Sequence, residues 1–180
     1  MPVSDIANIA QILYRVSASN PKSVLELGVG FGKYGVLVRE IQEAVNGRCN
    51  KNDFKNLLVG VEGFPQYNND NWANYNSVLT QDFSDESNWK DYAGYDMVLM
   101  IDSLEHVEKV KAKKLLQFLI DNNREVIVSV PLGHCPQGAV FGNVFETHQD
   151  DWSLEDFTDF RCFNMTKLHQ ATCVVYSFKR

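Results

Sequence analysis

Glycine, carboxylate and imidazole side chains gather at a few short runs of this sequence. The first run is E-L-G-V-G-F-G at 26–32, with glycine at every second position from Gly28 to Gly32. Glycines let the backbone turn tightly and let a ligand approach it with no Cβ in the way. A helix that starts after such a loop also offers unpaired backbone N–H groups. The run therefore predicts a loop that binds a flat or charged ligand.

Two classes of ligand compete for this loop. Gly30, Gly32 and Gly35 match the G-x-G-x-x-G spacing of a dinucleotide site, which predicts NAD. Glu26, however, stands two residues before Gly28, at the end of an apolar run. A carboxylate at that place sits badly against a pyrophosphate but suits an ammonium group. Glu26 therefore favours a ligand that carries an ammonium group over NAD.

Further polar residues follow the next two apolar runs. Glu62, in V-G-V-E-G-F, is placed to accept both hydroxyls of a ribose, which fits either class of ligand. Asp82 is a candidate acceptor for an adenine amino group, with Phe83 as an apolar wall. Asp82 is equally well explained as a turn or cap residue. Phe64 either stacks on adenine or covers the edge of the sheet.

The run I-D-S-L-E-H-V at 101–107 brings acidic and imidazole groups to the end of another apolar run. His106 is the first candidate for a general base, because the ordinary pKa of imidazole is near neutral. The alternative is that Glu105 and His106 start a helix and orient a loop. His148 and His134 are the second and third candidates for the base.

A metal site is a further possibility near the end of the chain. Glu146, His148, Asp150 and Asp151 lie within six residues of one another. Loose acidic clusters are usually solvated surface, so we expect no metal site here.

A second unusual stretch holds Tyr67, Trp72 and Tyr75 between polar residues. It predicts either the border of an acceptor pocket or a surface helix packed on the sheet.

The elements that must position these residues alternate along the chain. Apolar runs predict strands at 23–27, 57–61, 77–83, 97–101 and 125–130, and two more at 163–168 and 172–178 joined by a turn at 169–171. Periodic apolar residues predict helices that start after Ser4, with the stripe Ile6, Ile9, Ala10 and Leu13, and at 34–45, 84–92, 153–160 and along Ala112, Leu115, Leu116 and Leu119. Strands that alternate with helices predict an α/β fold, a three-layer α/β/α sandwich with a mostly parallel, Rossmann-like sheet and an antiparallel C-terminal edge.

In this order the motifs resemble the class I S-adenosylmethionine-dependent methyltransferases, across nearly the whole length of the chain. The resemblance rests on V-L-E-L-G-V-G-F-G at 24–32, Glu62, Asp82, Y-D-M-V-L-M-I-D-S-L-E-H-V at 95–107 and V-I-V-S-V-P at 126–131. The stretch 137–152 looks like a loop of bacterial members whose acceptor is unassigned. The run at 101–107 is not of the N/D-P-P-Y type, which disfavours methylation of amino groups on bases or glutamine.

This resemblance implies a seven-stranded sheet in which the last hairpin inserts an antiparallel strand, within a single domain over 1–180. It implies S-adenosylmethionine as the cofactor and S-adenosylhomocysteine as its product. Glu26 would hold the methionine amino group, and Gly28, Gly30 and Gly32 would form the cofactor loop. The remaining cofactor residues would be Glu62 and Gly63 at the ribose, Phe64, Asp82 and Phe83 at the adenine, and Asp102, Ser103 and Leu104 near the methionine portion.

The sequence thus predicts a methyltransferase that acts on an oxygen of a small molecule or a saccharide-like metabolite. Only the N-terminal helix, within 1–20, and the loop after Pro131 remain to build the acceptor pocket. Two alternatives stay open. One is an NAD-dependent oxidoreductase, and the other is a noncatalytic module that binds S-adenosylmethionine as a regulatory ligand.

Composition limits the partners. The 180 residues fit one domain, and the net charge of −6 argues against nonspecific nucleic-acid binding. The first twenty residues hold no secretory signal, and the purest apolar stretch, 97–101, is too short to span a bilayer. The four cysteines form no C-x-x-C pair, which predicts free thiols in a reducing cytoplasm. The oligomeric state has no signature in the sequence.

Overall fold

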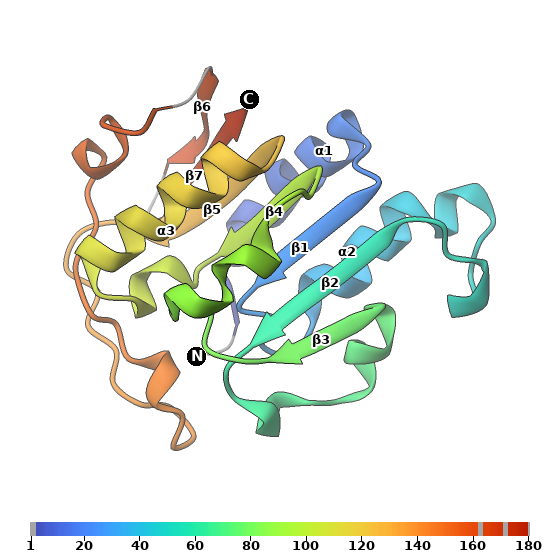
Figure 1. Cartoon of the computed structure of the whole chain (residues 1–180), viewed down its shortest axis with the longest axis horizontal. Helices are drawn as coiled ribbons and strands as arrows, with labels where there is room; N and C mark the ends of the chain where they lie inside the picture. The colour runs from blue at the N-terminus through green and yellow to red at the C-terminus, as the bar shows by residue number, and fades with distance from the viewer. Residues whose placement is uncertain (1–2, 162–163, 171–172, 180) are drawn as a thin grey trace.

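The computed structural model describes residues 3–161, 164–170 and 173–179. Seven strands form one sheet in the order β3-β2-β1-β4-β5-β7-β6 (Figure 1). The strands are β1 (Ser23–Leu27), β2 (Leu57–Glu62), β3 (Ser77–Thr80), β4 (Met97–Ile101), β5 (Glu125–Pro131), β6 (Asn164–Gln170) and β7 (Cys173–Lys179). The α-helices are α1 (Ile9–Ser19), α2 (Lys33–Gln42) and α3 (Lys109–Asn122). Short 3₁₀ helices are η1 (Ile6–Asn8), η2 (Ala44–Asn46), η3 (Lys51–Asp53), η4 (Pro65–Tyr67), η5 (Asp70–Asn74), η6 (Glu86–Tyr92), η7 (Leu104–His106), η8 (Val144–Glu146) and η9 (Glu155–Phe157).

The predicted three-layer sandwich is confirmed. Strands β1 to β5 pair in parallel, and β7 runs antiparallel between β5 and β6. Helices α1 and α2 cover one face of the sheet, and α3 with η6 covers the other (Figure 1). Every residue of β4 is buried, as expected for a central parallel strand that is covered on both faces.

The apolar stripe predicted for the fifth helix is also confirmed, whereas that of the first is shifted. In α3 the residues at i, i+3, i+4 and i+7, from Ala112 to Leu119, are all buried. In α1 the buried residues are Ile12 and Val16, and Ile6 is 76% exposed. The reason is that a 3₁₀ turn precedes α1, so Ile6 is out of phase with the helix.

Two predictions near the C-terminus are wrong. The expected helix at 153–160 is a single 3₁₀ turn, in which Phe157 packs against Trp152 and Tyr176 in the core, with ring centroids 5.3 and 4.7 Å away. The expected turn at 169–171 is also misplaced, since β6 continues to Gln170. Residues 162–163 and 171–172, part of that prediction, lie outside the described residues.

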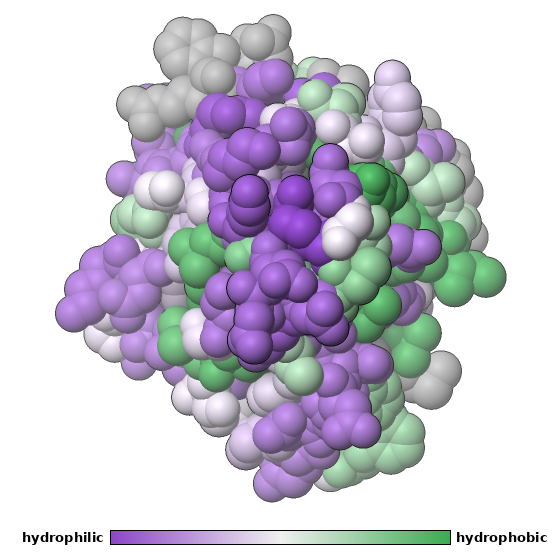
Figure 2. Space-filling model, turned by 90° about the vertical axis from the view of Figure 1, so that its right-hand side faces the viewer, coloured by the Kyte–Doolittle hydropathy of each residue, from purple (hydrophilic) through white to green (hydrophobic). Residues whose placement is uncertain are grey.

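The polar segment 46–56 is anchored to the fold by a buried carboxylate. Glu43, fully buried, accepts hydrogen bonds from the backbone N–H groups of Asn56 (2.8 Å) and Lys55 (3.0 Å) and pairs with Arg48. Arg39 donates to the carbonyl of Asn56 at 2.7 Å. Figure 2 views the side from which this segment projects in Figure 1, and hydrophilic side chains cover much of that face.

Among the described residues, none of the helices has the length and apolar character needed to cross a membrane. Cys49 and Cys135 are free and exposed, whereas Cys162 and the side chain of Cys173 lie outside the described part of the structure.

Candidate functional site

A pocket opens at the carboxyl ends of the central parallel strands. Strand order reverses between β1 and β4, which is where open α/β sheets bind their ligands. The pocket has a volume of about 200 Å³ and is partly open to solvent. Two segments that belong to none of these strands, Val3–Ser4 and Asn143–Glu146, also line the pocket.

Glu26, the last polar residue of β1, lines this pocket but is almost fully buried. Its Oε2 accepts a hydrogen bond from the Tyr75 hydroxyl at 2.6 Å, and the backbone N–H of Gly35 donates to that hydroxyl at 3.0 Å. Burial raises the pKa of Glu26 to about 8, although the Tyr75 hydrogen bond opposes the shift. A cation in the pocket would favour the ionised form.

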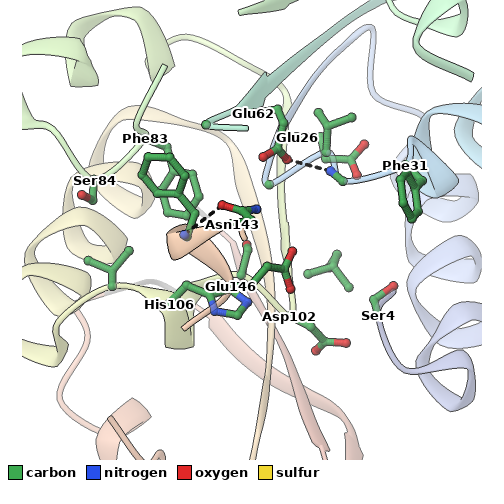
Figure 3. Close-up of a pocket in the computed structure, with 18 of the residues that line it drawn as sticks. Ser4, Glu26, Phe31, Glu62, Phe83, Ser84, Asp102, His106, Asn143 and Glu146 are labelled. Carbon is green, nitrogen blue, oxygen red and sulfur yellow. Dashed lines mark hydrogen bonds between the residues drawn. The ribbon is translucent and has the colours of Figure 1, made fainter. Parts of the chain in front are cut away.

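Glu62, at the end of β2, faces the same space from the neighbouring strand (Figure 3). Its two carboxylate oxygens accept hydrogen bonds from Gly30 N at 2.8 Å and Phe64 N at 2.9 Å. Burial raises the pKa of Glu62, and these backbone hydrogen bonds oppose the rise. The glycine loop is thereby tied to the second strand through the Glu62 carboxylate.

Packing within the fold also requires glycine at two positions in and after the loop. Gly28 has a φ of +86°, and a Cβ there would lie 2.7 Å from the Cβ of Ser103 at the end of β4. Gly35, the third glycine of the dinucleotide spacing, lies against Tyr75, and a Cβ would be 2.3 Å from its ring. Gly35 therefore makes room for the tyrosine that hydrogen-bonds to Glu26.

The aromatic stretch between β2 and β3 supports the pocket from behind. The Tyr67 hydroxyl donates to Glu146 at 3.1 Å, and the Trp72 indole N–H donates to the carbonyl of Gly30 at 2.9 Å. Together with Tyr75, which donates to Glu26, each of these aromatic side chains thus hydrogen-bonds to a residue that lines the pocket. None of the three lines either pocket; the stretch forms the 3₁₀ helices η4 and η5, whose polar residues are mostly exposed while Tyr67 and Tyr75 are buried, so the expectation of a surface helix packed on the sheet is the one that fits.

The N-terminal segment closes one side of the pocket. The backbone N–H of Asp5 donates to Asp102 Oδ2 at 2.7 Å. Lys33, at the start of α2, donates from Nζ to the carbonyl and hydroxyl oxygens of Ser4 at 2.8 and 2.9 Å. Figure 3 shows Ser4 and Asp102 on the same side of the cavity.

A second pocket adjoins the first, and His106 and Asp102 line both. His106 Nδ1 lies 3.3 Å from the carbonyl oxygen of Thr147, and its ring centroid is 4.9 Å from that of His148. Burial, together with His148, lowers the pKa of His106 to about 4, so its imidazole is neutral near pH 7. His134 also lines the second pocket, but it is exposed and its Nδ1 pairs with Asp151 Oδ2 at 3.0 Å.

The first pocket gathers all but three of the residues that the family resemblance assigned to the cofactor. These are Glu26, Gly28, Gly30, Glu62, Gly63, Asp82, Phe83, Asp102 and Ser103. Gly32, Phe64 and Leu104 lie outside the lining. Gly32 is the N-cap of α2, Phe64 packs edge-on against Tyr67, and Leu104 is fully buried in the core.

Several lining residues were not predicted individually. Lys33, Asn143 and Phe145 belong to this group, as do Val3 and Ser4. For all but Lys33, the sequence indicated only the neighbouring segments, the N-terminal helix and the loop after Pro131; Lys33 directly follows the glycine loop. Phe145 packs on the backbone of Gly63, where a Cβ would come within 3.0 Å of its ring. No local sequence pattern predicts such a contact, because Phe145 and Gly63 are far apart in sequence.

No family model matches the chain, and no curated protein matches it in sequence. The fold, however, has similar solved structures. The N-terminal domain of EvdMO1, crystallised with SAH and D-fucose, is 14% identical over 98% of this chain and 84% of its own, with a TM-score of 0.65. This chain has a class I methyltransferase fold. The methyltransferase domain of bacterial CtHen1 is 15% identical over 98% of this chain and 100% of its own (TM-score 0.63). Magnesium protoporphyrin IX methyltransferase from Synechocystis PCC 6803, with SAH bound, is 14% identical over 97% and 82% (TM-score 0.63).

Proposed function

We propose that this protein is an S-adenosylmethionine-dependent methyltransferase. The observation that carries the proposal is the buried carboxyl group of Glu26 in the wall of the pocket. Among the described residues, no cationic side chain forms an ion pair with it. A ligand ammonium group would supply the missing positive charge, whereas the pyrophosphate of NAD would repel the ionised form.

The remaining lining fits the other parts of this cofactor. Glu62 faces the pocket next to Gly30, and each of its carboxylate oxygens has further acceptor capacity for a ribose hydroxyl. Asp82 and Phe83 follow β3 and offer an acceptor and an apolar wall to the adenine. Asp102 and Ser103 would flank the methionine portion. Gly63, next to Glu62, also lines the pocket.

When bound, the cofactor supplies a methyl group that is activated by its sulfonium. The protein's part is then to align the acceptor with that methyl group and to exclude water, which accounts for much of the rate of an in-line transfer. The segments Val3–Ser4 and Asn143–Glu146 line the pocket and would limit the access of water to it. The second pocket, joined through Asp102 and His106, is the proposed place of the acceptor.

For the acceptor we propose an oxygen of a small molecule or a saccharide-like metabolite. The second pocket has carboxylate, imidazole and amide groups that hydrogen-bond hydroxyls. EvdMO1, one of the similar structures, was crystallised with D-fucose. The net charge of −6 supports a small molecule over nucleic acid. The exposed thiols of Cys49 and Cys135 support the proposal that the protein works in the reducing cytoplasm.

Calorimetric titration with S-adenosylmethionine, S-adenosylhomocysteine and NAD tests the proposal. We expect saturable binding of the first two and none of NAD. Binding of NAD alone would show that the pocket belongs to an oxidoreductase. Binding of S-adenosylmethionine without turnover of any hydroxylated acceptor in a screen would instead favour a regulatory binding module.

The Gly30→Val variant tests the glycine loop itself. Gly30 lines the pocket with a φ of +54°, which a β-branched residue rarely adopts. We expect the variant to fold, as judged by circular dichroism, and to lose cofactor binding because its side chain fills the cofactor's place. Normal binding by the folded variant would contradict the assignment of this loop.

A further inference from the structure

Three side chains of metal-binding type meet where the two pockets join. Glu105 and His106 belong to η7, just after β4, and His148 comes from the segment that follows η8. One potential ligand atom from each residue lies within 4.8 Å of the others. The segments are held together by a backbone hydrogen bond from Gln149 N to Glu105 O at 2.9 Å.

One oxygen of the buried Glu105 carboxyl group has no hydrogen-bond partner in the part of the chain that the structure describes. This oxygen is Oε2, and the residue is 2% exposed. An unsatisfied buried oxygen costs free energy, and a missing ion is one of the few explanations for it. Asp102 and Glu146 add negative charge around Glu105, which also favours a cation at this place.

Each of the two imidazoles has a backbone carbonyl oxygen within reach of its Nδ1. His106 Nδ1 contacts the carbonyl oxygen of Thr147 at 3.3 Å, and His148 Nδ1 contacts the carbonyl oxygen of Cys135. A carbonyl that accepts the Nδ1 proton fixes the neutral tautomer and leaves the Nε2 lone pair for a cation. The two rings lie next to each other, with centroids 4.9 Å apart.

We propose that Glu105, His106 and His148 bind one divalent first-row transition-metal ion at the junction of the two pockets. Two imidazoles with one carboxylate suit Mn²⁺, Co²⁺ or Zn²⁺ better than Mg²⁺ or Ca²⁺, which prefer all-oxygen sites. Metal–ligand bonds of about 2.0–2.2 Å place ligand atoms roughly 3–4 Å apart. Closing the observed arrangement around an ion therefore needs side-chain movements of about 1 Å.

The position of this ion gives it a role in the proposed reaction, and that role, unlike the binding itself, rests on the proposed function. Three protein ligands leave coordination positions open toward the second pocket. An acceptor hydroxyl bound there would lose its proton more readily, to water, because the cation lowers its pKa. The oxygen then forms its bond to the methyl carbon as the carbon–sulfur bond breaks, and the sulfur leaves as a neutral thioether. His106 and His148 thus act as ligands rather than as general bases.

Titration of the chelator-treated, tag-free protein with MnCl₂ tests the site, with the free Mn²⁺ followed by electron paramagnetic resonance. We expect one saturable site, displacement of Mn²⁺ by ZnCl₂, and visible absorption bands of a coordinated ion when CoCl₂ is used instead. His148→Ala and Glu105→Gln should each weaken Mn²⁺ binding by about 100-fold or more. His134→Ala, which removes an exposed imidazole of the second pocket, is the matched control and should bind Mn²⁺ like the parent protein.

Calorimetry with S-adenosylhomocysteine alone, on the same samples, separates the two proposals. A protein that binds S-adenosylhomocysteine but none of the three metal ions would overturn the metal site. Equal Mn²⁺ binding by His148→Ala and the parent protein would do the same. Mn²⁺ binding that His148→Ala abolishes, in a protein that does not bind S-adenosylhomocysteine, supports the metal site and refutes the proposed function. His148 is only half-buried, so its variant keeps the test valid if Glu105→Gln fails to fold.

Discussion

Replacing Glu26 by Gln should stabilise the folded protein while it weakens cofactor binding. Glutamine has nearly the shape of a protonated glutamic acid and keeps an oxygen that accepts the hydrogen bond from Tyr75. The substitution removes only the ability of the side chain to become an anion. The variant therefore separates the free-energy cost of a buried carboxylate from the packing of the side chain.

The magnitude follows from the pKa of Glu26, which burial raises from 4.5 to about 8. Because the folded state holds this proton more tightly than the unfolded chain, stability falls as pH rises from about 4.5 to about 8. At pH 7 the free energy of unfolding is lower by about 3 kcal/mol, since each pH unit between the unfolded-state pKa and pH 7 contributes about 1.4 kcal/mol. Glutamine avoids this loss, and about 3 kcal/mol raises the melting temperature of a protein of this size by roughly 6–12 °C.

Glu125 provides the control of opposite sign. It is also fully buried, but its carboxylate accepts hydrogen bonds from Ser177 and Ser19, both at 2.6 Å, and pairs with Arg15. Burial alone would raise the pKa of Glu125, yet these partners outweigh it and lower the pKa. Its ionised form therefore contributes stability above the unfolded pKa, and Glu125→Gln should lower the melting temperature at pH 7.

Urea and thermal unfolding at pH 4.5 and pH 8, with and without S-adenosylhomocysteine, measure both effects. The advantage of Glu26→Gln should be close to zero at pH 4.5 and largest at pH 8. At pH 8 the variant should bind S-adenosylhomocysteine about 10-fold or more weakly, because a charge-assisted hydrogen bond is lost. An advantage that does not change with pH would refute the argument from burial. Undiminished binding would refute the pairing of Glu26 with the ligand ammonium group.

Two further predictions concern the surroundings of Glu26. Binding of S-adenosylhomocysteine at pH 7 should release about 0.8 proton, because Glu26, with its pKa of about 8, is roughly 90% protonated before binding and the ligand amine gains only about 0.1 proton. Calorimetry in phosphate and in Tris buffer measures the number of protons released. A value near zero would contradict the prediction. Gly35→Ala should destabilise the protein by about 1–3 kcal/mol, because its Cβ would lie 2.3 Å from the ring of Tyr75, which must then leave Glu26. Gly138→Ala, in open space, is the control for the unfolding measurement, and equal stability of the two variants would show that Tyr75 moves freely.

Local patterns in the sequence were sufficient for the central elements of the fold. Strands β1 and β4 begin and end at the predicted residues, and the stripe from Ala112 to Leu119 is buried as predicted. Hydrophobic periodicity and glycine placement act over a few residues, so they can be recognised without knowing what packs against them. For the same reason Glu26 and Glu62 were recognisable as pocket residues, because parallel strands bring their carboxyl ends to one edge of the sheet.

Tertiary structure alone decided which distant segments complete the site. It placed Tyr75 against Glu26, docked Asp5 on Asp102, and brought His148 beside Glu105 and His106. These partners are 42 to 97 residues apart in the sequence, and their pairing depends on the strand order and on how each loop crosses the sheet edge. A buried group's pKa and its role as ligand, base or support are set by such neighbours, so neither is written in the local sequence.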